Sequence, residues 1–176
     1  MEDLIRAFDA LPPDEIDHYW LTVVGETWEG WTLPGALIAR SRYRDRITFV
    51  NRYVTDDEVD GIFGGADVVV LPYYRCSQSG TLHVAMSYGL PVVVTSVGGL
   101  VEAVAGYGGA VLTEPANPMA LVAALRRAAA LRGQRFAAPR SWAKTAQRYQ
   151  DFLARLDAVA SRRRHRRGTR PRAGTP

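Results

Sequence analysis

The chain has 176 residues, of which 47% are hydrophobic and 23% charged, so it can bury one well-packed core and has the composition of a globular protein. A single cysteine, Cys76, excludes an internal disulfide framework and favours a cytosolic setting. With three scattered histidines it gives no metal-ligand spacing, and we expect neither a metal nor a cofactor. No stretch is long and apolar enough to span a membrane, and the first residues lack the layout of a signal peptide.

The net charge of +4 comes from the carboxyl end of the chain. Residues 162–172 hold seven arginines and no acid, so residues 1–160 carry 15 basic and 18 acidic groups, or −3. Residues 161–176 show no apolar periodicity, so we expect a folded domain over 1–160 and a disordered Arg-rich tail over 161–176. Such a tail can touch nucleic acid or anionic lipid. A solvated tail is favoured over a nucleic-acid partner because aromatic residues do not interleave with the arginines.

The first part of the chain is expected to fold as helix, strand, helix and strand. Apolar residues at helical spacing predict the helices, and short apolar runs predict the strands. The expected bounds are 3–11, 19–24, 33–41 and 47–50. Thr55 and Glu58 then have the spacing of a capping box, which predicts a further helix that ends at Gly64.

The stretch 66–95 predicts a strand, a loop, a helix and a second strand. Val68–Leu71 and Val92–Thr95 are continuous apolar runs, which are typical of strands buried on both faces. The helix between them ends at Gly89. A helix between two such strands is a βαβ crossover, so the sheet is expected to be parallel.

The loop before this helix has the groups that bind an anion. The N–H groups of Ser79, Gly80 and Thr81 would lack partners within the helix, and they lie at the positive end of its dipole. The loop also supplies a hydroxyl, an amide and a positive charge, from Ser77, Gln78 and Arg75. Ser79 could instead serve only as an N-cap. These residues alone leave both interpretations open.

The rest of the chain continues the alternation of helices and strands. Helices are expected over 100–105, 118–132 and 142–160, the last capped by Ser141, and a strand over 110–112. The predicted fold class is therefore α/β, with a doubly wound, Rossmann-like parallel sheet. Ligands of such sheets bind beyond the carboxyl ends of the strands. The residues expected there are Gly25-Glu26, Asn51-Arg52-Tyr53, Tyr74–Thr81 and Thr95–Gly99, and together they favour a nucleotide-type ligand.

Five ordered motifs carry a family resemblance. They are FVNRYV at 49–54, ADVVVLPY at 66–73, SQSG at 77–80, AMSYGLPVV at 85–93 and GGLVEAV at 98–104. Together they resemble the carboxyl-terminal, nucleotide-sugar-binding domain of GT-B-fold glycosyltransferases of the group 1 (family 4) type. The resemblance covers roughly residues 3–158.

The resemblance implies a retaining, metal-independent transfer of a sugar from a nucleotide-diphosphate donor. The amides of Ser79–Thr81 would hold the diphosphate, the loop Asn51–Val54 would border the base, and Gly98-Gly99 would leave room beside the sugar. Preorganised donors at a helix terminus suit the charge that develops on the departing diphosphate. The family also implies a cytoplasmic location at the membrane face, and the charge of the basic tail would suit a peripheral contact there.

Two positions depart from the family pattern. Many members carry a pair of glutamates around this helix, and Cys76 and Val84 stand in those places. The SQSG loop resembles a subset of the family that has a T/S-Q-S-G sequence there. His83 could meet the ribose, although a packed or solvent-facing histidine is favoured. Cys76 is not expected to act as a nucleophile, because no neighbouring histidine or acid would activate it.

Family members also have parts that this sequence lacks. The family domain begins with one more strand and a loop with an Arg and a Lys, and an amino-terminal domain supplies the acceptor site. We therefore expect a truncated or split enzyme that is inactive as this chain alone, with exposed sheet edges. A non-catalytic nucleotide-sugar-binding or interaction module is the alternative. A Rossmann dehydrogenase is disfavoured because no G-x-G-x-x-G motif follows the first expected strand.

Overall fold

The computed structural model describes residues 1–27, 30–139 and 142–168. The chain divides into two compact units, Met1–Pro139 and Arg140–Pro176. The first unit therefore ends before the expected domain boundary at residue 160. Its helices are α1 (Glu2–Asp9), α2 (Leu33–Arg40), α3 (Asp56–Gly64), α4 (Gly80–Ser87), α5 (Gly99–Ala103) and α6 (Pro118–Ala129), with 3-10 turns at Ile16–His18 and Arg44–Arg46. Its strands are β1 (Leu21–Val24), β2 (Ile47–Val50), β3 (Val69–Leu71), β4 (Val92–Thr95) and β5 (Ala110–Thr113).

Every strand pairing in this unit is parallel, which confirms the predicted α/β class. The strands form two sheets, one of β1 and β2 and one in the order β3-β4-β5. Leu21 pairs with Ile47 in the first sheet, and Val69 with Val92 in the second. The prediction of one sheet is therefore corrected, because β1 and β3 are not hydrogen-bonded to each other.

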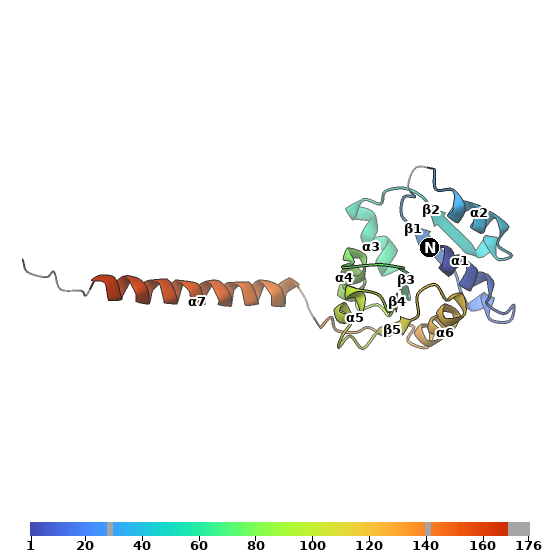
Figure 1. Ribbon diagram of the computed structural model, residues 1–176. Coiled ribbons are helices and arrows are strands. Elements are labelled where there is room, and N and C mark those ends of the chain that lie inside the picture. The colour runs from blue at the N-terminus through green and yellow to red at the C-terminus, as the bar shows by residue number, and fades with distance from the viewer. Residues whose placement is uncertain (28–29, 140–141, 169–176) are drawn as a thin grey trace, which may run out of the picture. The chain divides into compact units, whose positions relative to one another are not determined.

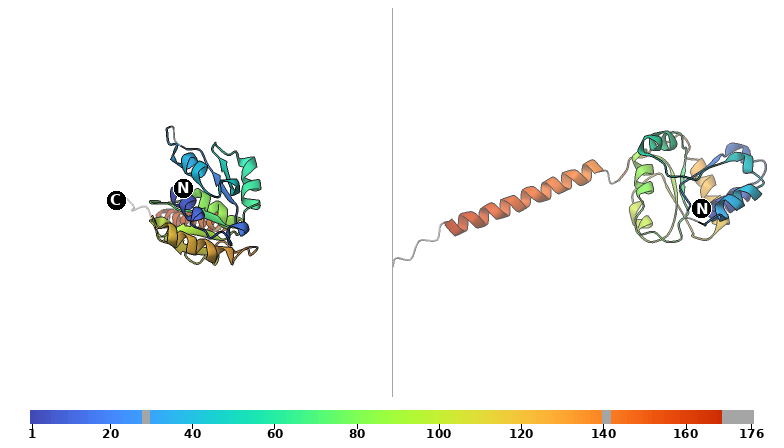
Figure 2. Two further views of the ribbon diagram at one scale, coloured as in Figure 1. Left: turned by 90° about the vertical axis from the view of Figure 1, so that its right-hand side faces the viewer. Right: turned by 90° about the horizontal axis from the view of Figure 1, so that it is seen from above.

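Helices cover both faces of the three-stranded sheet. Val93 points into one apolar cluster together with α1 and α6, whereas Val92 and Val94 point into a second cluster together with α4 and α5. Figures 1 and 2 show α4 and α5 on one side of the strands and α1 and α6 on the other. All four residues of β4 are buried, as its continuous apolar sequence predicts.

Capping residues in the sequence predict where the helices start more accurately than apolar runs predict the bounds of the strands. The capping box of Thr55 and Glu58 forms at the start of α3, and Asn117 caps α6 by accepting from Ala120 N at 3.0 Å. β1 is shorter than expected, since it begins at Leu21 and Trp20 is 63% exposed.

The second unit contains α7 (Trp142–Gly168). The predicted helix ends at residue 160, but α7 continues, so residues 161–168 are helical and not part of a disordered tail. Arginine is a strong helix former, so a run of arginines can extend a helix without apolar periodicity. Ser141 and residues 169–176 lie outside the described residues. The predicted apolar stripe of α7 is exposed in this unit, with Tyr149, Phe152, Leu153 and Leu156 between 49% and 67% accessible.

Among the described residues, none of the helices combines the length and apolar character that crossing a membrane requires.

Candidate functional site

The loop before α4 forms a helix N-terminus with a dedicated cap. Ser79 is buried, and its Oγ accepts a hydrogen bond from Leu82 N at 3.2 Å. Ser79 is therefore the N-cap of α4. The helix geometry leaves the N–H groups of Gly80 and Thr81 without carbonyl partners inside α4, and both residues are exposed. Two backbone donors and the positive end of the helix dipole thus lie at an exposed end of α4.

Gly98 and Gly99 hold this loop by direct backbone contact. Gly99 N donates to Cys76 O at 3.1 Å. A Cβ atom at Gly98 would lie 2.1 Å from Cys76 O, and one at Gly99 would lie 2.0 Å from Ser77 O. Gly98 also has a positive φ of 47°, which favours glycine. The glycines therefore serve the packing of one loop on another, and their role beside a sugar stays a prediction.

Two further hydrogen bonds fix the same loops. Thr95 Oγ1, at the end of β4, donates to Tyr73 O at 2.6 Å, just after β3. The Cys76 thiol donates to Gln78 O at 3.1 Å. The loops that follow β3 and β4 therefore form one connected structure, with Cys76 bonded to the backbone within it.

The loops that follow β1 and β2 form a second connected pair. Thr27 N donates to Asn51 Oδ1 at 2.8 Å, which ties the Gly25–Thr27 segment to the end of β2. Gly25 has a φ of 132°, and its N–H donates to Val50 O at 3.1 Å. The positive φ turns the chain away from the sheet where a side chain would be strained.

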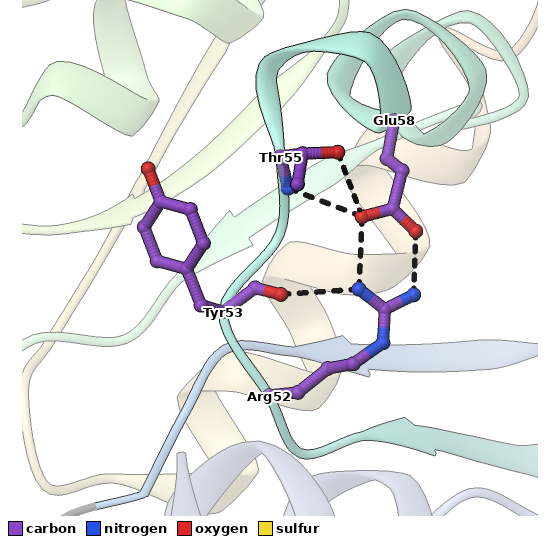
Figure 3. A network of polar contacts seen from close by, with 4 residues as sticks. All are labelled: Arg52, Tyr53, Thr55 and Glu58. Carbon is purple, nitrogen blue, oxygen red and sulfur yellow. Dashed lines mark hydrogen bonds and ion pairs between the residues drawn. The ribbon is translucent and has the colours of Figure 1, made fainter.

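Arg52 and Glu58 brace the loop between β2 and α3 (Figure 3). The Arg52 guanidinium donates to both carboxylate oxygens of Glu58, at 2.8 Å from Nη1 to Oε2, and also to Tyr53 O at 3.0 Å. Glu58 Oε2 further accepts from Thr55 N at 3.1 Å. These bonds, that of Arg52 first, lower the pKa of Glu58 to about 2. The positive charge of Arg52 is thus already paired within the loop, while Tyr53 is 73% exposed.

One contact of the site was not anticipated from the sequence. The Tyr74 hydroxyl donates to Asp3 Oδ2 at 2.8 Å and links the loop after β3 to the first turn of α1. The Asp3 carboxylate raises the pKa of Tyr74, and the smaller effect of burial acts in the same direction. Asp3 is 5% exposed. In the sequence, an acidic residue at a helix start indicates only a favourable interaction with the helix dipole. It does not indicate a hydrogen-bond partner 71 positions away.

The structure thus brings the predicted residues together in two groups. The loops after β3 and β4 form one group and the loops after β1 and β2 form the other, and the hydrogen bonds given above lie within each group. The side chains of Glu26, Arg75, Gln78 and His83 are exposed. His83 faces solvent on the first turn of α4, as favoured from the sequence. No cluster of three metal-binding side chains occurs in the described part of the chain.

A shallow groove of about 340 Å³ lies beyond β4 and β5. Ser96, Glu114 and Arg127 line it, together with Thr113. The Thr113 hydroxyl is buried and has no hydrogen-bond partner among the described residues. Of the residues expected at the site, only Ser96, within the Thr95–Gly99 loop, borders this groove.

Comparisons with known proteins agree with the geometry. The family described as glycosyl transferases group 1 matches residues 1–130 of the chain. A D-inositol 3-phosphate glycosyltransferase from Salinispora tropica is 34% identical over 176 residues, which cover 91% of this chain and 36% of the relative.

Solved structures share the fold. The sucrose-phosphate synthase of Thermosynechococcus elongatus matches with a TM-score of 0.65 and 22% identity, over 90% of this chain and 42% of that one. The Anabaena protein HepE, solved in complex with UDP-glucose, matches with a TM-score of 0.64 and 21% identity, over 88% of this chain and 44% of that one. The chain therefore spans less than half the length of each of these proteins.

Proposed function

Because the chain belongs to the group 1 glycosyl transferases, we propose that it binds the nucleotide-diphosphate part of a sugar donor in a glycosyltransferase. The observation that carries the proposal is the helix N-terminus at Gly80 and Thr81, held in place by Gly98 and Gly99. A nucleotide sugar is the chemical class that a HepE structure contains. The proposed reaction retains the anomeric configuration and uses no metal.

The diphosphate would lie against the start of α4. Ser79 Oγ accepts from Leu82 N and keeps its own O–H, so the donors proposed for a ligand are the N–H groups of Ser79–Thr81 and the hydroxyls of Ser79 and Thr81. Charge-assisted hydrogen bonds of this kind contribute about 1.5–3 kcal/mol each. The donors are fixed before the ligand arrives, so they would stabilise the charge that grows on the departing diphosphate.

The charged groups within residues 74–84 favour an anion, and the Asp3 carboxylate beside Tyr74 is contributed by α1. Residues 74–84 contain no carboxylate, and Arg75 is exposed with no ion pair to another described residue. Arg52 in the second loop is already paired with Glu58. We therefore assign Arg75 and not Arg52 to the diphosphate, and we place the base near the exposed ring of Tyr53.

Sugar transfer is proposed for a larger assembly than this chain. The chain spans 36% of the inositol phosphate glycosyltransferase and 42% of the sucrose-phosphate synthase. An acceptor site on a further domain or a separate chain would complete the active cleft, and this chain alone would be inactive. We place the protein in the cytoplasm, with a peripheral contact of the basic tail at the inner membrane face.

The proposal is tested by thermal unfolding of the full chain with UDP, GDP or ADP at millimolar concentration. A ligand that binds only the folded state stabilises it by about 2.7 kcal/mol at a hundredfold excess over its dissociation constant. We expect one nucleotide to raise the midpoint. Gly80→Asp should abolish that rise through charge repulsion, whereas Gly80→Ala should retain it. A Cβ atom at Gly80 meets nothing within 4 Å, and an acid at a helix start favours folding, so neither variant should misfold.

A rise that is the same in both variants would contradict the assignment to α4.

The second candidate function is a nucleotide-sugar-binding module without turnover. The absence of carboxylates from residues 74–84 supports this alternative. Binding that persists without sugar transfer, when the acceptor domain of a relative is supplied, would favour it.

A further inference from the structure

Helices α3 and α4 lie side by side and are joined through their side chains (Figure 1). Tyr88, the C-cap of α4, stacks its ring on that of Phe63 in α3, with the ring centroids 5.6 Å apart and an angle of 27° between the ring planes. The Tyr88 hydroxyl also donates to Asp60 Oδ1. Asp60 and Phe63 are three positions apart, so they lie on the same face of α3. We call Asp60, Phe63 and Tyr88 the α3–α4 clasp.

Helix α3 has few other buried contacts. None of its nine residues, all of which the structure describes, is fully buried. Phe63 packs against the buried cluster that contains Leu82 and Met86 of α4. Segments with few buried apolar contacts separate from the rest of a protein at low cost in free energy. The clasp therefore has a large share in holding α3 against α4.

Each helix carries one group of the residues proposed to bind the ligand. Glu58, in the first turn of α3, accepts hydrogen bonds from Arg52 and from Thr55 N, so the loop 51–55 is tied to α3. The proposed phosphate donors are the N-cap and the first residues of α4. Within the described residues, no hydrogen bond joins the loop 51–55 directly to the loop 74–81. The separation of the two loops therefore depends on how α3 and α4 pack.

The clasp is remote from both loops along the helices. Asp60 lies at the middle of α3 and Phe63 near its end, and Tyr88 follows the last residue of α4. A helix of eight or nine residues is an internally hydrogen-bonded rod of about 12–14 Å. A change in the clasp would therefore shift the starts of the two helices relative to each other, although none of its side chains belongs to either loop.

We propose that Asp60, Phe63 and Tyr88 are positioning residues, which hold the base-binding loop at 51–54 at the distance from the start of α4 that a nucleoside diphosphate spans. Such a ligand contacts both loops, whereas inorganic pyrophosphate contacts the start of α4 alone. The clasp thus determines how much more tightly the site binds a nucleoside diphosphate than pyrophosphate. This inference rests on the proposed function, because it takes both loops as binding elements.

Loss of the clasp should weaken the binding of the two ligands unequally. If the loops have the correct spacing in only a fraction of the molecules, the apparent dissociation constant of a ligand that needs both loops rises by the inverse of that fraction. Removal of a stacked aromatic pair corresponds to a change of about three- to tenfold. Pyrophosphate does not require the spacing, so its dissociation constant should stay within about twofold of the wild-type value.

The test is isothermal titration of the full chain with UDP, GDP, ADP and pyrophosphate. Tyr88→Leu removes the ring and the hydroxyl but keeps an apolar side chain, and Phe63→Leu removes the stack from the α3 side. Both variants should raise the Kd of the preferred nucleotide by about three- to tenfold and leave that of pyrophosphate unchanged. Tyr107→Phe is the matched control, because it removes a buried hydroxyl outside the clasp, which donates to Leu90 O at 2.7 Å. That variant should lose stability and keep the wild-type ratio of the two constants.

An unchanged ratio in both clasp variants, or an equal loss of both ligands, would overturn the inference. If the wild type binds no nucleotide, the proposed function fails, and amide exchange without ligand tests the clasp by itself. Tyr88→Leu should then speed exchange in 51–64 by about threefold more than in 92–95, and Tyr107→Phe should not. Equal exchange rates in 51–64 for wild type and Tyr88→Leu would show that the clasp does not hold the loop in position.

Discussion

The carbonyl oxygen of Ser77 lies 2.0 Å from the point where a Cβ atom at Gly99 would sit. No non-bonded carbon atom can approach an oxygen this closely, so a side chain at Gly99 must displace the loop before α4. That loop carries the proposed phosphate-binding donors. The contact thus links the identity of one glycine to the geometry of the binding site.

Gly99→Ala is expected to destabilise the protein by about 1–3 kcal/mol and to weaken nucleotide binding. Gly61→Ala is the matched control, because a Cβ atom there meets nothing within 4 Å and the residue lies inside α3. Alanine at that position should be neutral or stabilising, by up to about 1 kcal/mol. Urea unfolding of both variants measures the difference. Equal free energies of unfolding for the two variants would mean that the loop before α4 can move to accommodate a side chain at residue 99 without loss of stability.

Tyr74→Phe is expected to lower the free energy of unfolding by about 0.5–1.5 kcal/mol, since it removes the hydrogen bond to the buried Asp3. The pKa of Tyr74 is raised in the folded state, so this stabilisation is complete below the ordinary value of 10.0 and is lost as the pH rises through the folded value. Unfolding at pH 8 and at pH 11 should therefore show a smaller difference between wild type and variant at pH 11. Tyr53→Phe, at an exposed ring, is the control for loss of a hydroxyl.

Arg52→Gln is expected to raise the pKa of Glu58 from about 2 towards its ordinary value of 4.5, because the main cause of the lowering is removed. The contribution of a carboxylate with a lowered pKa is present above pH 4.5 and is lost as the pH falls through about 2. Carboxyl titration by NMR gives the midpoint directly. Arg44→Gln is the control, since Arg44 pairs with Asp45 at 3.6 Å and, among the described residues, not with Glu58. A Glu58 midpoint that stays near 2 without Arg52 would contradict the pairing.

Phe136→Ala is expected to destabilise the first unit by about 2–3 kcal/mol, below the usual cost for a fully buried phenylalanine. Its ring packs edge-on against Tyr107 at 6.0 Å, and its N–H donates to Gly89 O at 2.9 Å. The matched variant is Phe152→Ala, on the exposed face of α7. Thermal unfolding should show a lower midpoint for Phe136→Ala and an unchanged midpoint for Phe152→Ala. A loss for Phe152 would show that the α7 stripe has a partner in solution.

The sequence by itself determined the class of the fold and the order of its elements. Continuous apolar runs such as Val92–Thr95 are typical of strands buried on both faces, and local caps such as Thr55 with Glu58 mark helix starts. The cap at Ser79 was also predictable from the sequence, because its hydrogen-bond partner is only three residues away.

Only the tertiary structure decided what depends on segments far apart in the chain. The division of the sheet at β1 and β3, the bond from Tyr74 to Asp3 and the contact of Gly99 with Ser77 have no local signature. Arg52 and Arg75 look alike in the sequence, yet geometry pairs the first with Glu58 and leaves the second exposed. Apolar periodicity reports that a residue is buried, whereas only packing selects the partner that buries it.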